Sequence, residues 1–477
     1  MDQVWQSVTF SQVMLTDWAR RSFLYRVISS FEPWRSGSIL LQWADPLGLV
    51  FISLVFVLNP FIPNSLTGLF LLAIAAFWVL LGLTDRPGQG LTPIHLLVTL
   101  YWGIATVATQ FSPVRSAAIE GWIKLTLYLI FFGLMARVLR SARLRQILVA
   151  VYLLTALIIS AYGIRQWFLG ATALATWVDP TSPLADSTRV YSYLGNPNLL
   201  GGYLIPAVFL SGVAIFAWEG WGCKALAVFM TGINLQCIAL TLSRGAWIGL
   251  VLGGLVLTLL LVYWWSRHWS AFWQTWAIPI ALGLLVGLGL VMVLTVEPLR
   301  LRVASIFAGR ADSSNNFRMN VWAAVVDMIR DRPILGIGPG NDAFNQIYPL
   351  YQRPRYTALS AYSVILELAV ETGFVGLTAF LWMLATAWTQ GWGAIQRLRH
   401  MGDRQGYWLL AAIATSIGML GHGLVDTVWY RPQINTLWWL SIALIASYYQ
   451  PPQGGQGVPL ASTSVASPPG AQESSEI

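Results

Sequence analysis

Long apolar runs, separated by short polar or proline- and glycine-containing segments, dominate the chain. Such runs are long enough, or nearly so, to cross the roughly 30 Å of hydrocarbon in a bilayer. Twelve of them lie at 47–62, 66–83, 94–110, 122–139, 146–169, 199–218, 225–242, 245–265, 275–296, 363–388, 407–425 and 434–449. In lipid, only helices and closed barrels form all the hydrogen bonds that their backbone N–H and C=O groups require. The pattern therefore predicts an all-α polytopic membrane protein with about twelve transmembrane helices and one long extracytoplasmic loop.

The composition strengthens this prediction. Hydrophobic residues make up 56% of the 477 residues and charged residues only 10%. A soluble protein of this size needs more charge to cover its surface, and the 25 tryptophans fit a protein that meets two membrane interfaces. Soluble enzymes and disulfide scaffolds are excluded. The net charge of +8 comes from Lys and Arg scattered among apolar runs, which indicates topology and contact with anionic lipid rather than nucleic acid.

Cysteine and histidine usage gives no sign of a disulfide, a metal site or a cofactor. Cys223 and Cys237 are fourteen residues apart in one apolar run. On a helix this is about 21 Å, too far for a disulfide. The four histidines show no spacing typical of metal ligands. We expect neither a metal nor another cofactor.

The distribution of lysine and arginine predicts which side of the membrane each loop faces. With the N-terminus inside, the inner segments carry fourteen of these residues, and eight more lie in the long loop 297–362. The short outer segments carry six, which are Arg115, Lys124, Arg165, Arg189, Arg244 and Arg431. The bias predicts cytoplasmic termini and a cytoplasmic loop 389–406, with 297–362 on the outer side.

These observations divide the chain into five parts. Residues 1–40 lack the core of a signal peptide; apolar residues at near-helical spacing beside arginines predict a helix on the inner membrane surface. Those residues are Trp18, Leu24, Val27, Ile28 and Phe31, with Arg20, Arg21 and Arg26. Nine spans follow at 45–296, then the outer loop at 297–362 and three spans at 363–449. The tail 450–477 is rich in Pro, Gly, Ser and Gln and predicts a disordered cytoplasmic segment.

The outer loop carries helix and turn signals, and long loops without structure are uncommon unless they are functional. Residues 313–315 offer a helix cap, and an apolar stripe continues to Pro333, which would end the helix. The stripe consists of Phe317, Val321, Val325 and Met328. The glycine-rich segment 336–341 predicts a tight, rigid turn over the membrane surface. It is not a phosphate-binding loop, because no strand precedes it and Pro339 removes an amide donor.

Ionisable residues in or near spans are candidates for function. Arg165, Arg244 and Arg318 all fall on the outer side and could converge on an anion. The alternative for each is to extend toward the outer lipid headgroups. We expect Arg244 and Arg318 to approach each other over an outward-facing cavity.

Two further pairs have helical spacing. Glu367 and Glu371 share a face of the tenth span, with Glu371 about nine residues deep. They could titrate or pair structurally. His422 and Asp426 repeat the spacing at the outer end of the eleventh span and could relay protons; the alternative is simple hydrogen bonding.

Several short motifs, in this order and with this long outer loop, resemble the O-antigen ligase and polymerase superfamily over roughly residues 190–380. They lie at 193–201, at 242–246, and from Arg318-x-x-x-Trp322 to the glycine-rich segment; Tyr362-Ser363 and then residues 373–376 follow. The chain looks most like a cyanobacterial branch called inorganic carbon transporter B, whose members are described as bicarbonate transporters. The resemblance implies a cyanobacterial membrane, and we expect the inner (plasma) membrane rather than the thylakoid.

In the ligases of this superfamily, outer-side arginines hold the diphosphate of a polyprenyl-linked glycan, and a histidine activates the acceptor hydroxyl. Arg244 and Arg318 match the family's arginines. Tyr362 stands where the family has its histidine, and the resemblance places its hydroxyl beside the arginines. A tyrosine with a pKa of about 10 is a poor general base.

Three functions follow from these observations. The first is bicarbonate uptake or accumulation, as the branch implies, and it makes the protein a transporter rather than an enzyme. The second is metal-independent glycosyl transfer from a polyprenyl-diphosphate donor. The third is a non-catalytic role beside an unidentified membrane protein partner.

Overall fold

The computed structural model describes residues 2–10, 32–84, 90–170, 189–295, 297–307 and 309–451, and all of its regular structure is helical. The predicted surface helix around Trp18 and nearly all of the predicted disordered tail lie outside the described residues. On either side of the predicted surface helix, the structure describes three short helices, α1 (Asp2–Val8), α4 (Glu32–Gly37) and α5 (Ile39–Gln42).

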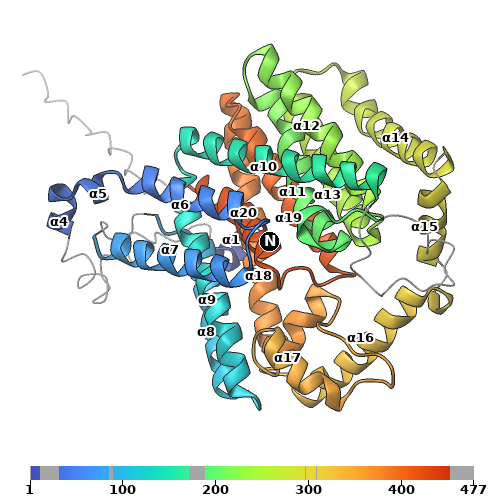
Figure 1. Cartoon of the computed structure of the whole chain (residues 1–477). Coiled ribbons are helices and arrows are strands. Elements are labelled where there is room, and N and C mark those ends of the chain that lie inside the picture. Colours follow the sequence, from blue (N-terminus) through green and yellow to red (C-terminus); the bar gives the residue numbers. More distant parts are fainter. Residues whose placement is uncertain are drawn as a thin grey trace, which may run out of the picture.

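A helix coincides with every apolar run that the sequence predicts (Figure 1). The helices are α6 (Ala44–Leu58), α7 (Asn64–Thr84), α8 (Pro93–Gln110), α9 (Arg115–Val138), α10 (Ala142–Leu169), α11 (Pro197–Ala217), α12 (Trp221–Leu240), α13 (Arg244–Trp265), α14 (Ala271–Thr295), α18 (Val364–Met401), α19 (Gly406–Gly423) and α20 (Pro432–Ser447). Among the described helices, eight are long and apolar enough to cross a membrane, namely α7, α9, α10, α11, α12, α13, α14 and α18. The protein is thus an all-α polytopic membrane protein, while the count of twelve spans stays a prediction.

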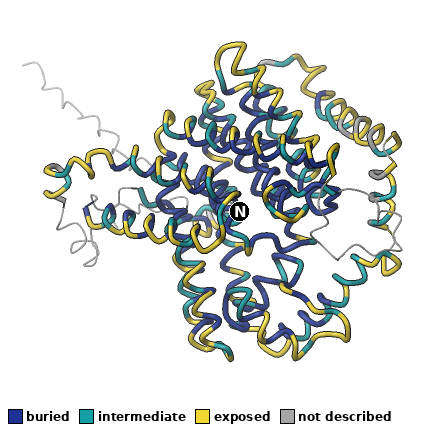
Figure 2. Tube along the Cα trace, viewed as in Figure 1, coloured by how far each residue is buried: buried dark blue, intermediate teal, exposed yellow. Residues whose placement is uncertain are grey.

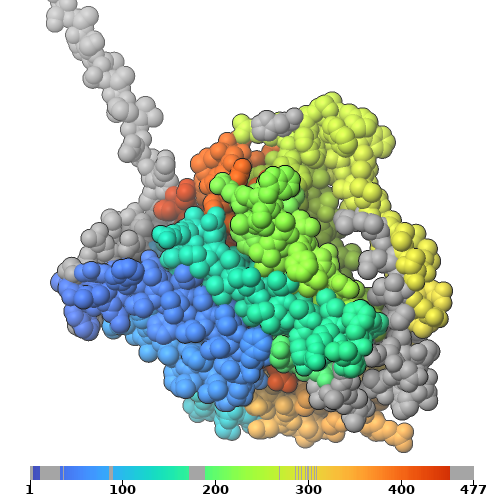
Figure 3. All heavy atoms as spheres, turned by 45° about the horizontal axis from the view of Figure 1, so that its top comes forward, coloured from blue at the N-terminus to red at the C-terminus, as the bar shows by residue number. Residues whose placement is uncertain are grey.

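Helices α11 and α19 form the centre of the bundle. α19 packs against α13, α11, α20 and α18, and Figure 2 shows the central helices as the most deeply buried part of the chain. α14 lies at the periphery and its apolar side chains are mostly exposed. In Figure 3 the N-terminal helices and the α14–α15 region form opposite edges of the molecule. We expect the exposed face of α14 to meet lipid.

Small residues let the central helices approach closely. Gly245, Gly249 and Gly253 repeat every four residues along α13. A Cβ atom at Gly249 would lie 2.4 Å from the carbonyl oxygen of Gly418 in α19. In lipid the hydrophobic effect does not drive helices together, so close backbone packing of this kind contributes much of their association.

The outer loop is mostly helical rather than irregular. It contains α15 (Glu297–Phe307), η4 (Gly309–Ala311), α16 (Ser313–Asp331), α17 (Asn341–Ile347) and η5 (Tyr348–Leu350). The cap of α16 is Asp312, one residue before the predicted cap, and its carboxylate accepts from the amide of Asn315 at 2.8 Å. The predicted stripe on α16 packs into a small core of its own with Phe344 and Tyr348.

Helix α18 is broken at Gly373, where φ is 67° and ψ is −174°. The glycine-rich loop packs against this break. The amide of Ile337 donates to the carbonyl of Val370, and the amide of Gly338 donates to that of Glu371, both at 2.9 Å. The loop therefore turns tightly, as predicted, but it also pairs backbone groups of α18 rather than merely lying over the membrane surface.

We predict that Gly249→Leu separates α13 from α19 and destabilises the protein by about 1–3 kcal/mol, as overpacking usually does. The matched control is Gly254→Leu on the same helix, where a Cβ atom has nothing within 4 Å. Detergent-induced unfolding of the two variants checks the prediction. Equal stability of both would contradict close packing at Gly249.

Candidate functional site

Six segments meet at one end of the bundle through side-chain contacts. They are the chain before α11, the N-termini of α11, α13 and α18, the α15–α16 part of the outer loop, and segment 424–431. Ser192, Leu242 and Tyr362, each beside one of these N-termini, adopt left-handed φ angles of 51°, 52° and 51°. Such backbone strain in residues other than glycine gathers at functional sites.

Arg244 is the first residue of α13 and points toward the outer loop. Its Nη2 lies 2.9 Å from Oδ1 of Asp312, and its Nη1 donates to the hydroxyl of Ser305 at 3.0 Å. Only 8% of the Arg244 side chain is exposed. Because Asp312 also caps α16, this ion pair joins the start of α13 to the start of α16.

Arg318 lies one turn into α16. Its Nη1 donates to the hydroxyl of Ser314 at 2.7 Å, and its Nη2 lies 3.5 Å from Oδ2 of Asp426. The same oxygen of Asp426 accepts from the side-chain amide of Asn198 at 2.6 Å. The Nε atom of Arg318 is buried and has no hydrogen-bond partner within the described part of the chain.

Arg189 is a third arginine in this place, and sequence reasoning missed it as a site residue. Its Nε donates to the carbonyl of Thr241 at 3.0 Å, and its Nη2 donates to Oδ1 of Asn198 at 3.2 Å. Burial lowers the pKa of Arg189 to about 10; the positive charge of Arg318 also lowers it, and Asp426 opposes the shift. Arg189 therefore stays charged at neutral pH.

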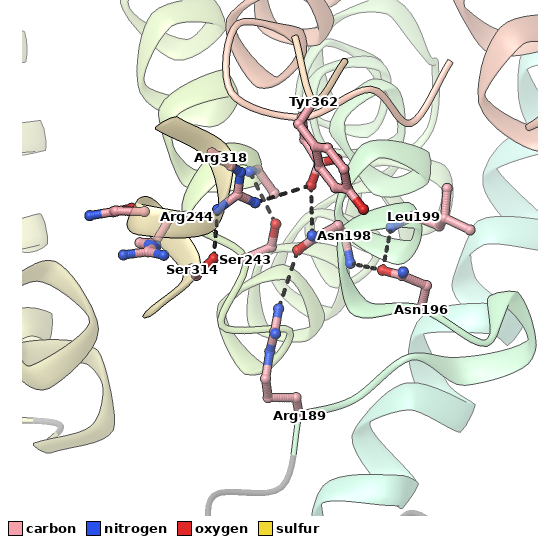
Figure 4. Close-up of polar contacts among 12 residues, drawn as sticks. Arg189, Asn196, Asn198, Leu199, Ser243, Arg244, Ser314, Arg318 and Tyr362 are labelled. Atoms are coloured by element: carbon pink, nitrogen blue, oxygen red, sulfur yellow. Dashed lines mark hydrogen bonds and ion pairs between the residues drawn. The ribbon is translucent and has the colours of Figure 1, made fainter. Parts of the chain in front are cut away.

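These residues form what we call the arginine cluster: Arg189, Arg244 and Arg318, which Figure 4 shows, together with their ion-pair partners Asp312 and Asp426. The charges of Arg244 and Arg318 are close enough to interact, so the two residues approach each other; the outward-facing cavity expected between them stays a prediction. Three arginines against two aspartates leave one net positive charge. An arrangement of this kind suits an anion with several oxygen atoms.

Tyr362 lies beside the cluster. Its ring meets that of Phe317 edge-on at 5.3 Å, and its carbonyl accepts from the indole of Trp322 at 3.3 Å. Burial raises the pKa of the Tyr362 hydroxyl, and the negative charge of Asp426 raises it further, with Arg318 opposing. The hydroxyl therefore stays protonated at neutral pH and can donate a hydrogen bond.

His422 and Asp426 do not share a helical face as expected, but they lie close enough to interact electrostatically, and a proton relay between them stays a hypothesis. α19 ends at Gly423, so Asp426 lies in the following loop and turns to Arg318. His422 is buried between α11 and α13, where a Cβ atom at Gly245 would lie 2.6 Å from its ring.

Glu367 and Glu371 hold backbone amides of the outer loop. Oε2 of Glu367 accepts from the amide of Ala361 at 2.6 Å, and Oε1 of Glu371 accepts from the amide of Gly340 at 2.8 Å. Each carboxylate thus helps to place an adjoining segment, one leading into Tyr362 and the other ending the glycine-rich loop.

Arg165 does not join the cluster through any of these contacts. Its side chain is exposed on α10, and its guanidinium carbon lies 5.7 Å from the centre of the Tyr162 ring. Within the described residues, no group of three or more His, Cys, Asp or Glu side chains could hold a metal ion.

Comparison with known proteins adds one finding. Residues 227–381 match the O-antigen ligase family model. This stretch is O-antigen ligase-like, and it runs from α12 into α18 with Arg244, Arg318 and Tyr362 inside it. Arg189 and Asp426 lie outside the matched residues. No curated protein matches the chain, and the family match lends no support to bicarbonate transport.

We predict that Asp426→Asn destabilises the protein by about 1.5–3 kcal/mol, the usual value of a hydrogen bond to a charged group, because the charged acceptor of the Asn198 amide and the ion-pair partner of Arg318 are lost. The control is Asp327→Asn, since Asp327 pairs with Arg330 and Arg353 at the surface, where such pairs contribute about 0–1 kcal/mol. Unfolding in detergent compares the two. A smaller effect at Asp426 than at Asp327 would show that Asp426 does not anchor Arg318.

Proposed function

We propose that the chain is an O-antigen ligase-like glycosyltransferase, which binds the diphosphate of a polyprenyl-linked glycan at the arginine cluster. The observation that carries the proposal is the convergence of Arg189, Arg244 and Arg318 from three separate segments. Two of the three lie in the stretch that matches the O-antigen ligase family.

The charge and donor pattern of the cluster fits a diphosphate. Guanidinium groups bind phosphate oxygens through paired N–H donors. Asp312 and Asp426 hold Arg244 and Arg318 in fixed orientations, so little side-chain freedom is lost on binding. The buried Nε of Arg318, which has no partner among the described residues, is a donor that a phosphate oxygen would satisfy.

Transfer needs a leaving group and a proton acceptor. The acceptor hydroxyl attacks the anomeric carbon of the donor sugar, the bond from that carbon to the diphosphate oxygen breaks, and the diphosphate leaves on the arginines. Positive charge already in place stabilises the charge that develops on the leaving oxygen. We assign the proton of the hydroxyl to Asp426, because Tyr362 is protonated and cannot take it.

Bicarbonate transport stays a separate hypothesis, resting on the branch resemblance alone. Bicarbonate flux into proteoliposomes of purified protein tests it independently of glycan transfer. A flux that Arg318→Gln abolishes would support it.

We predict that Arg244→Gln and Arg318→Gln each weaken binding of polyprenyl diphosphate by about 10- to 100-fold, since a charged hydrogen bond is worth about 1.5–3 kcal/mol. Arg318→Lys should bind the diphosphate little better than Arg318→Gln does, because lysine lacks the planar pair of N–H donors. Binding to nanodisc-embedded protein is the measurement, with the exposed Arg165→Gln as the matched control. An equal loss of diphosphate binding in Arg165→Gln would contradict a specific binding site at the arginine cluster.

We predict that Tyr362→Phe leaves the rate of glycan transfer and its pH profile between pH 6 and 9 nearly unchanged. The raised pKa keeps Tyr362 protonated across this range, so no titration limb can come from it. Asp426→Asn should lower the rate of folded protein by about 10²–10⁴-fold, the usual contribution of a general base. A basic limb that disappears in Tyr362→Phe would instead make Tyr362 the base.

A further inference from the structure

A large cavity lies beside the arginine cluster but is not lined by it. Its volume is about 620 Å³. Its walls come from α7, α8, α9, α18 and α20, from residues 339–345 of the outer loop and from segment 427–431. The proposed function, as argued so far, leaves this cavity without a role.

Aromatic rings form much of the inner wall. The rings of Trp429 and Trp438 lie 4.0 Å apart between centres, and Phe380 lies 6.0 Å from Trp438. Tyr101 and Tyr128 complete this wall. Flat aromatic surfaces suit a ligand with apolar faces as well as polar groups.

Several buried polar atoms of the lining have no hydrogen-bond partner within the described residues. They are Oε1 of Glu367, Oγ1 of Thr427, Nε1 of Trp429, Nε of Arg431, Oδ1 of Asn435 and Nε1 of Trp438. The two tryptophan side chains are only 8% and 1% exposed. The Asn435 amide nitrogen already donates to the carbonyl of Trp429 at 2.9 Å, which leaves its oxygen as an acceptor. Buried polar groups normally have hydrogen-bond partners, so this mixture of donors and acceptors is suited to a ligand that offers both.

The polar groups around the cavity favour a neutral ligand. Glu367 and Glu371 in the wall can accept hydrogen bonds or, when protonated, donate them. A cation would be repelled by Arg431 and would leave the indole N–H donors unsatisfied. Lys124 and Asp342 neutralise each other at the rim, 2.7 Å apart. A neutral ligand that both accepts and donates hydrogen bonds satisfies this lining, and a sugar has these groups together with apolar faces.

We propose that this cavity binds a neutral saccharide and, resting on the proposed function, that the saccharide is the acceptor glycan. The cavity and the arginine cluster share a wall. Thr427 lines the cavity and directly follows Asp426 of the cluster. Glu367 lines the cavity and holds the amide of Ala361, the neighbour of Tyr362. A sugar in the cavity therefore has the proposed proton acceptor on the adjoining segment.

Saturation-transfer NMR on nanodisc-embedded protein tests the proposal. The probes are neutral trisaccharides of hexoses and of N-acetylhexosamines, decyl maltoside as a sugar on an apolar tail, and spermidine as a cationic control. We expect at least one neutral sugar to bind. Binding of trisaccharides identifies a free glycan as sufficient, whereas binding of decyl maltoside alone identifies a lipid-carried glycan.

Variants then locate the site. Trp438→Phe and Asn435→Leu remove one unpaired donor and one unpaired acceptor at similar volume and should weaken sugar binding by about tenfold. Trp276→Phe, at an exposed position of α14, should not change it. Arg244→Gln should weaken diphosphate binding by about 10- to 100-fold and spare sugar binding, so the two proposals can fail separately. Binding of spermidine in preference to every sugar, absence of sugar binding, or sugar binding that neither cavity variant weakens would overturn the inference.

Discussion

The backbone of α18 places a constraint on which the rest of the outer face depends. A helix broken at Gly373 leaves carbonyl groups without helical partners, and lipid offers none. The glycine-rich loop supplies them through the amides of Ile337 and Gly338. Because only a short turn separates these residues from the end of α16, the pairing fixes that part of the outer loop to the bundle. The position of Arg318 relative to Arg244 is a consequence of that attachment.

Ion pairs then set the orientation of the arginines. A buried cation needs a partner, and losing one partner is costly. Asp312 and Asp426 provide partners for Arg244 and Arg318 without neutralising the whole cluster, because Arg189 adds a third positive charge. The same segment that carries Asp426 continues into the wall of the neighbouring cavity. Donor and acceptor sites in the proposed reaction are therefore held by common elements, which fits a transfer between two bound groups.

The helices could be predicted from the sequence because apolar length alone specifies them, and each predicted run has its helix. Arg244 and Arg318 could be predicted because a short motif and their shared side of the membrane both indicated them. Arg189 could not, since it lies in a loop without periodicity and is placed by contacts to Thr241 and Asn198. Arg165 was a candidate only because of its side of the membrane, and that side does not indicate which face of a helix packs against the rest of the protein.

Other features needed tertiary information. The sequence predicts a tight turn at 336–341 but not the break in α18 that it pairs with, because those two segments are distant along the chain. The spacing of His422 and Asp426 is helical, yet α19 ends between them. The cavity depends on side chains from α7, α9, α18 and α20 together, and no local pattern reports such a gathering.

The most direct test of the central claim is an experimental structure of the protein in nanodiscs with polyprenyl diphosphate bound. The account predicts phosphate oxygens within about 2.7–2.9 Å of guanidinium nitrogens of the arginine cluster, the usual distance for such charged hydrogen bonds. It also predicts that the aromatic cavity beside the cluster stays free of the diphosphate. A diphosphate seated in that cavity, or elsewhere with the arginines untouched, would contradict it.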